Sequence, residues 1–156
     1  MSLETKHDLN EATVKELQSL IRACIDSYDG FHESAEELDD PRLKMAFKEL
    51  GDQRSAMASE LQQLVEFNGE KAENDGSVAA KTHRVWINIR SKLSSGETQA
   101  ILEEAERGED YIKAAYEDVL KATAGSAVND LLTEQYTQMK AGHDKIRDVR
   151  DAGRSK

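Results

Sequence analysis

Apolar residues recur along this chain in alternating steps of three and four, the spacing that forms an apolar stripe along one side of an α-helix. This repeat packs helices against one another at small crossing angles. The clearest stretch, between residues 10 and 38, predicts a first helix that belongs to a bundle. Its stripe runs without a break through Val14, Leu17, Ile21, Cys24, Tyr28, Phe31, Ala35 and Leu38.

A second helix is predicted over about 41–67, with a start and an end marked by single residues. Asp40 offers a side chain that can cap a helix N-terminus, and Pro41 takes the first helical position, where a missing N–H costs nothing. Gly69 suits the turn that ends the helix. Because the turn before Pro41 is short, the first two helices should form an antiparallel hairpin.

Three further amphipathic stretches, at about 78–93, 97–123 and 127–151, are also predicted to be helical. Ser94 and Glu97 match a capping box at the start of the second of these. About 28 residues, including the short helix, separate the second and third long helices, whereas a tight turn needs only a few.

A connection of this length can run the full length of the bundle and let the second and third long helices lie parallel. The prediction is a single all-α domain over residues 1–156. Its expected architecture is a ferritin-like four-helix bundle with a long crossover that contains a short extra helix.

The composition supports a helical domain and excludes some classes of binding partner. The chain has 156 residues, of which 38% are apolar, and a net charge of -10 that argues against binding to nucleic acid or an anionic membrane. It has no long apolar segment that could span a membrane, and its N-terminus is polar, so a cytoplasmic location is expected. The lone Cys24 excludes an internal disulfide and is interpreted as a core residue.

Two charged residues lie on apolar stripes. Glu109 follows the stripe of the helix 97–123, and Arg54 lies between Leu50 and Met57. An ionised group in a helix interface needs a partner. We therefore predict a bidentate, at least partly buried pair between Arg54 and either Glu109 or Glu106. The simpler alternative is that Arg54 extends along the bundle to reach solvent at its edge.

Gln135 and His143 lie on or beside the stripe of the last helix. His143 is either a metal ligand or proton shuttle, or a hydrogen-bonded histidine at the boundary of the core. A ferritin-like dinuclear site needs a Glu from each of two helices and Glu-x-x-His from the other two. Here Lys140 stands three residues before His143, and no carboxylate lies on the first helix's stripe. The polar stripe residues are therefore interpreted as structural, with no catalytic residue assigned: Arg54, Glu106, Glu109, Gln135 and His143.

The crossover helix carries its own polar and aromatic group, His83, Arg84 and Trp86. This group could form a ligand-binding patch. The simpler interpretation is that the crossover closes over the bundle, with the indole burying its rings and donating its N–H.

Four short segments carry a resemblance to a family of uncharacterised bacterial ferritin-like four-helix-bundle proteins, described only as a domain of unknown function. The resemblance covers roughly residues 14–151. It implies the four-helix fold and a bacterial cytoplasmic setting but no established activity. Relatives commonly have Glu-Arg where this chain has Gln53-Arg54, which removes one carboxylate that a metal site could use. The segments are Glu60-Leu61, His83-Arg84-x-Trp86, Glu106-Arg107-Gly108-Glu109-Asp110 and His143-Asp144-x-Ile146-Arg147.

The lack of a complete catalytic set favours a non-catalytic, acidic bundle that needs no cofactor. We expect it to act as a homodimer or through contacts with other proteins, for example in a stress response. A small-ligand pocket beside Gly108 and Gly142, where side chains are missing, is a further hypothesis. The main alternative is an atypical ferritin-like protein or oxidoreductase that binds iron or another divalent metal through Asp52, Glu106, Glu109 and His143.

Overall fold

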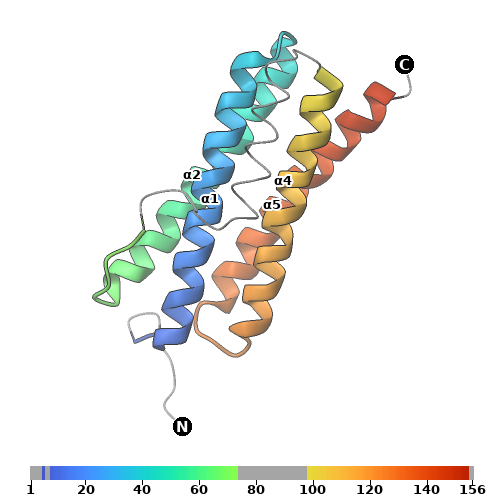
Figure 1. Cartoon of the computed structure of the whole chain (residues 1–156). Coiled ribbons are helices and arrows are strands. Elements are labelled where there is room, and N and C mark those ends of the chain that lie inside the picture. The colour runs from blue at the N-terminus through green and yellow to red at the C-terminus, as the bar shows by residue number, and fades with distance from the viewer. Residues whose placement is uncertain (1–4, 6–7, 74–97, 155–156) are drawn as a thin grey trace.

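The computed structural model describes residues 5, 8–73 and 98–154. The predicted crossover helix and the capping box at Ser94 lie outside this part of the chain. Within it the secondary structure is helical, apart from an isolated bridge between Thr5 and Asp8. The all-α prediction is therefore confirmed for the described residues. The helices in Figure 1 are α1 (Glu11–Glu37), α2 (Pro41–Phe67), α4 (Thr98–Ala122) and α5 (Asn129–Arg154).

The predicted signals at both ends of α2 are present. The Asp40 carboxylate accepts a hydrogen bond of 2.9 Å from the backbone N–H of Arg42, and Pro41 is the first helical residue. At the other end Gly69 has a φ of 79°, and its N–H donates to the carbonyl of Glu66 at 3.0 Å. A left-handed backbone conformation at this position favours glycine and ends the helix.

The last helix begins slightly later than its apolar stripe suggests, at Asn129 instead of about residue 127. Gly125 has a φ of 84°, and the N–H of Ser126 donates to the carbonyl of Thr123 at 2.8 Å. The N–H of Asn129 then donates to the carbonyl of Ser126 at 3.1 Å. Because of these turn hydrogen bonds, the connection between α4 and α5 includes the first residues of the range predicted for the last helix.

The four helices of the described residues occupy the corners of a bundle. α1 packs against α2 and α4, and α5 packs against α4 and α2, so α2 and α4 lie on a diagonal. Figure 1 shows α1 and α5 running in one direction and α2 and α4 in the other. The two diagonal helices are therefore parallel, and their side chains can meet only across the centre of the bundle.

The apolar core consists of two clusters, one toward each end of the bundle. In the cluster near the α1–α2 turn, the rings of Phe31 and Phe47 meet edge to face with centroids 5.3 Å apart. Each fully buried large apolar side chain contributes about 1.5–3 kcal/mol through removal from water. The other cluster combines the first half of α1 and α5 with the second half of α2 and α4, and includes Leu17, Ile21, Cys24, Met57, Leu61, Ile112, Tyr116, Val128, Leu132 and Met139.

Candidate functional site

A buried ion pair crosses the bundle between the two apolar clusters. The Nη2 group of Arg54, on α2, donates a hydrogen bond to Oε2 of Glu109, on α4, and both side chains are 0% exposed. Neither residue belongs to an apolar cluster, although each lies on its helix's apolar stripe. The sequence left Glu109 and Glu106 as possible partners of Arg54, and the structure pairs Arg54 with Glu109.

The pair is not bidentate, as the sequence had suggested. Within the described part of the chain, Nε of Arg54 and Oε1 of Glu109 are buried without a hydrogen-bond partner. The second Nη group of Arg54 donates to Oε1 of Gln53, the preceding residue. The bidentate prediction is therefore wrong. Arg54 divides its two Nη groups between Glu109 and Gln53, and its Nε makes no hydrogen bond to the second carboxylate oxygen.

The environment of the guanidinium explains its orientation. Its Cζ lies 5.9 Å from the centroid of the Phe31 ring, close enough for a cation–π attraction. On the α5 side, a Cβ added to Gly142 would lie 3.7 Å from Nη2 of Arg54 and only 2.5 Å from Cδ2 of Leu50. Gly142 therefore lets α5 approach α2 closely.

This close approach corrects the predicted ligand pocket. The missing side chain of Gly142 leaves no space, because Leu50 fills it. Gly108 is buried within α4. Gly142 therefore serves helix packing instead of lining a cavity.

A second set of buried polar groups lies in the apolar cluster that contains Cys24, Met57 and Tyr116. The hydroxyl of Tyr116 donates to Oε1 of Gln135 at 2.8 Å, and Nε2 of Gln135 donates to the carbonyl of Met57 at 3.3 Å. The Cys24 sulfur lies 3.4 Å from the Tyr116 oxygen. Because the Tyr116 proton is directed to Gln135, the thiol is the donor in that contact. The chain of contacts ties all four helices together through buried polar atoms.

These groups are neutral at physiological pH. Burial raises the pKa of the Cys24 thiol from 9.0 to about 11, although its hydrogen bond with Tyr116 opposes the shift. Burial also raises the pKa of the Tyr116 hydroxyl well above its ordinary value of 10.0, and the neighbouring Cys24 adds to this shift. A buried thiol with a raised pKa is a poor nucleophile. The prediction of Cys24 as a core residue is confirmed.

His143 lies among several carboxylates between α4 and α5. Its Nε2 lies 2.6 Å from Oδ1 of Asp110, and its Nδ1 lies 3.4 Å from Oδ1 of Asp144. One carboxylate oxygen of Glu106 joins the group, so the ligand atoms of Glu106, Asp110 and His143 all lie within 4.8 Å of one another. The hydrogen bond with His143 lowers the pKa of the Asp144 carboxyl below its ordinary value of 3.8.

The predicted metal set is only partly assembled. Glu106 and His143 come together, but Glu109 is committed to Arg54. Asp52 lies 3.0 Å from Nε2 of His32 on α1. Asp110 was missed by reasoning from the sequence, because it lies off the apolar stripe. Its separation of four residues from Glu106 places both side chains on one side of α4, and this spacing is the sequence signal that could have identified it.

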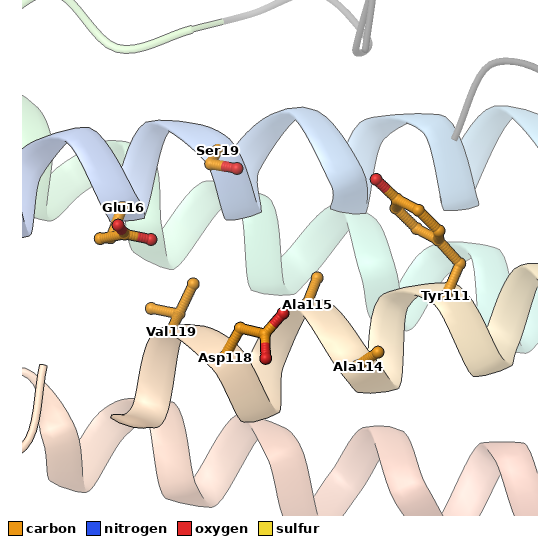
Figure 2. A pocket seen from close by; sticks show the side chains of 7 residues that line it. All are labelled: Glu16, Ser19, Tyr111, Ala114, Ala115, Asp118 and Val119. Carbon is orange, nitrogen blue, oxygen red and sulfur yellow. The ribbon is translucent and has the colours of Figure 1, made fainter. Parts of the chain in front are cut away.

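A groove of about 460 Å³ lies between α1 and α4. Figure 2 shows Glu16 of α1 and Asp118 of α4 directed into the space between the two helices, with Tyr111 at one end. Two carboxylates beside small apolar residues suit a cationic ligand better than an anionic one. This groove is separate from both the buried ion pair and the His143 cluster. The predicted crossover patch of His83, Arg84 and Trp86 lies outside the described residues.

A comparison with known protein families finds one that matches most of the chain. A family model described as a domain of unknown function, DUF2383, matches residues 12–122. The chain belongs to this family. The match spans α1, α2 and α4 and therefore includes Arg54, Glu106 and Glu109, whereas Gln135 and His143 lie on α5 beyond it. No curated protein matches the chain.

The described helices are too polar or too short in their apolar stretches for any of them to cross a membrane. Acidic residues exceed basic ones on α1 and α4, whereas the two signs balance on α2 and α5.

Proposed function

We propose that this member of the DUF2383 family is a non-catalytic helical bundle that acts by self-association through the exposed face of α2. One observation carries the proposal. Met45 and Phe67 are 63% and 64% exposed, and both belong to α2. The two side chains lie on the same side of α2 near its two ends, so a partner helix that lies along α2 would cover both.

The spacing of these residues suits a symmetric dimer. Met45, Ala56 and Phe67 are separated by two steps of eleven residues, and eleven residues make about three helical turns. They therefore lie on one side of α2, with the exposed Ala56 at the midpoint. If two copies of α2 pack antiparallel about a two-fold axis at Ala56, Met45 of each copy meets Phe67 of the partner. The small side chain at the axis permits close approach.

The interior of the bundle supports a role without catalysis. A ferritin-like dinuclear centre needs carboxylates from several helices at the middle of the bundle. There the buried Arg54 pairs with Glu109. We also propose the ferritin-like assignment itself, which the parallel course of α2 and α4 supports. A bacterial cytoplasmic setting belongs to the same proposal and rests on the resemblance to bacterial relatives.

Charge makes the proposed dimer dependent on salt. Two copies that each carry a net charge of -10 repel one another, and salt screens that repulsion. Association should therefore strengthen as the ionic strength rises, because the apolar contacts at Met45 and Phe67 do not depend on charge.

Light scattering on a sizing column, over a wide range of protein concentration and at two ionic strengths, tests the proposal. We expect a dimer for the unmodified chain and a monomer for the double variant Met45→Glu with Phe67→Glu. Thr137→Glu with Ala141→Glu adds the same two carboxylates at exposed positions of α5 and is the matched control, which should remain dimeric. A strict monomer at all concentrations would overturn the proposal. An equal loss of the dimer in the control would move the interface away from α2.

A further inference from the structure

Three metal-ligating side chains converge between α4 and α5, at the edge of the bundle. Glu106 and Asp110 are four residues apart on α4, and His143 faces them from α5. Their ligand atoms lie within 4.8 Å of one another. The side chain of His143 is 9% exposed, whereas that of Asp110 is 62% exposed. The group therefore has a buried nitrogen on one side and access to solvent on the other.

The contacts of His143 match those of a metal-ligating histidine. Its Nε2 is directed at Asp110, at 2.6 Å, and its Nδ1 faces Asp144, at 3.4 Å. In metal sites the second ring nitrogen commonly donates to a carboxylate, which fixes the orientation of the ring. Asp144 also lies 3.4 Å from Nη1 of Arg147, which holds that carboxylate beside the ring.

From these positions we propose that Glu106, Asp110 and His143 bind one first-row divalent cation, with zinc as its type. One imidazole nitrogen and two carboxylate oxygens form a donor set that such ions accept, with solvent in the remaining position. The proposal is independent of self-association, because the site lies on α4 and α5 and not on the exposed face of α2. It also differs from a ferritin-like dinuclear centre, whose ligands project into the middle of the bundle.

Little movement is needed to accept the ion. Zinc bonds to nitrogen and to carboxylate oxygen at about 2.0–2.2 Å, so ligand atoms around one ion lie roughly 3 Å or a little more apart. The exposed Asp110 carboxylate can rotate, while the buried imidazole stays in place. When the ion binds, the Nε2 lone pair coordinates it, and any proton on that nitrogen passes to solvent. The hydrogen bond between His143 and Asp110 is then replaced by two bonds to the metal.

The chain contains a matched control for this cluster. His32 and Asp52 form a second histidine–carboxylate pair, with Nε2 and Oδ1 3.0 Å apart. Their side chains are 32% and 72% exposed. Among the described residues this pair belongs to no group of three metal-ligating side chains. This pair offers an imidazole nitrogen and a carboxylate oxygen, as the proposed site does. A difference in zinc affinity between the two therefore measures the contribution of the third ligand and of the burial of the imidazole ring.

The test uses the full-length protein, purified without an affinity tag, stripped with chelator and exchanged into chelator-free buffer. Titration calorimetry with zinc chloride measures affinity and stoichiometry, and the visible absorption of added Co²⁺ reports the ligand set. We expect one equivalent of zinc and a Co²⁺ band that indicates nitrogen and oxygen ligands. Asp110→Asn, Glu106→Gln and His143→Gln should each weaken zinc binding at least tenfold. His32→Gln should leave it unchanged.

Asp110→Asn keeps the experiment interpretable, because an exposed position tolerates this change without loss of folding, which circular dichroism can verify. Failure of the unmodified protein to bind zinc stoichiometrically would overturn the proposal. Wild-type affinity in folded Asp110→Asn would overturn it as well. So would an equal loss of binding in His32→Gln and His143→Gln.

Discussion

Replacing Arg54 by methionine should destabilise the protein far more than replacing Arg54 and Glu109 together. Both side chains are 0% exposed, so Arg54→Met leaves the Glu109 carboxylate buried and without its partner. Removing one partner of a buried ion pair costs about 3–5 kcal/mol. Replacing both partners by apolar residues of similar size is often neutral or stabilising, by about 1–4 kcal/mol. The double variant Arg54→Met with Glu109→Leu should therefore be at least about 3 kcal/mol more stable than Arg54→Met alone.

Urea unfolding followed by circular dichroism measures this difference, provided that the slopes with urea remain similar among the variants. An exposed ion pair provides the comparison. Lys145 and Glu49 also join two helices, at 4.0 Å, but their side chains are 54% and 63% exposed. The same double-variant cycle with Lys145→Met and Glu49→Leu should give a coupling of about 0–1 kcal/mol. Equal midpoints for Arg54→Met and its double variant would refute the reasoning, as would a coupling no larger than that of the exposed pair.

Three further predictions concern packing and buried polar groups. Gly142→Leu should lower the midpoint of thermal unfolding, because its Cβ alone would lie 2.5 Å from Cδ2 of Leu50 and 3.7 Å from Nη2 of Arg54, and the rest of the side chain must displace both. Overpacking of this kind costs about 1–3 kcal/mol. Tyr116→Phe should cost about 1–3 kcal/mol in urea unfolding, because it leaves Oε1 of the buried Gln135 without its donor, and an unchanged midpoint would contradict this. Stability should also fall as pH rises from about 9 to 11, because the unfolded Cys24 thiol ionises over this range while the folded thiol stays neutral. A shift of this size is worth roughly 3 kcal/mol, and Cys24→Ala should show a correspondingly flatter decline in urea midpoints over the same pH range.

The extent of each long helix could be read from local patterns. The stripe that starts at Val14 and the cap at Asp40 act between residues close in sequence, so they define α1 and the start of α2 without knowledge of the rest of the chain. The same reasoning singled out Arg54 and Glu109, because a charge on an apolar stripe is visible as a break in a local period.

The partners of these charges depend on the relative height and rotation of helices that are far apart in sequence. Glu106 and Glu109 differ by less than one turn of α4, and a small rotation of that helix would exchange their roles. In the structure Glu109 faces the centre and meets Arg54, while Glu106 turns toward His143 and Asp110.

By itself, then, the sequence determined which segments of the described residues are helical, where α2 begins and ends, and which charged residues lie on the apolar stripes. Those features follow from backbone hydrogen bonding, capping and periodicity, all of which act within a few turns. Only the tertiary structure decided that the Arg54 contact is single and not bidentate, that Leu50 fills the space beside Gly142, and that Asp110 joins His143. Each of these contacts would be made or lost by a shift of a few ångströms between packed helices. The apolar period that predicts a helix contains no information about such shifts.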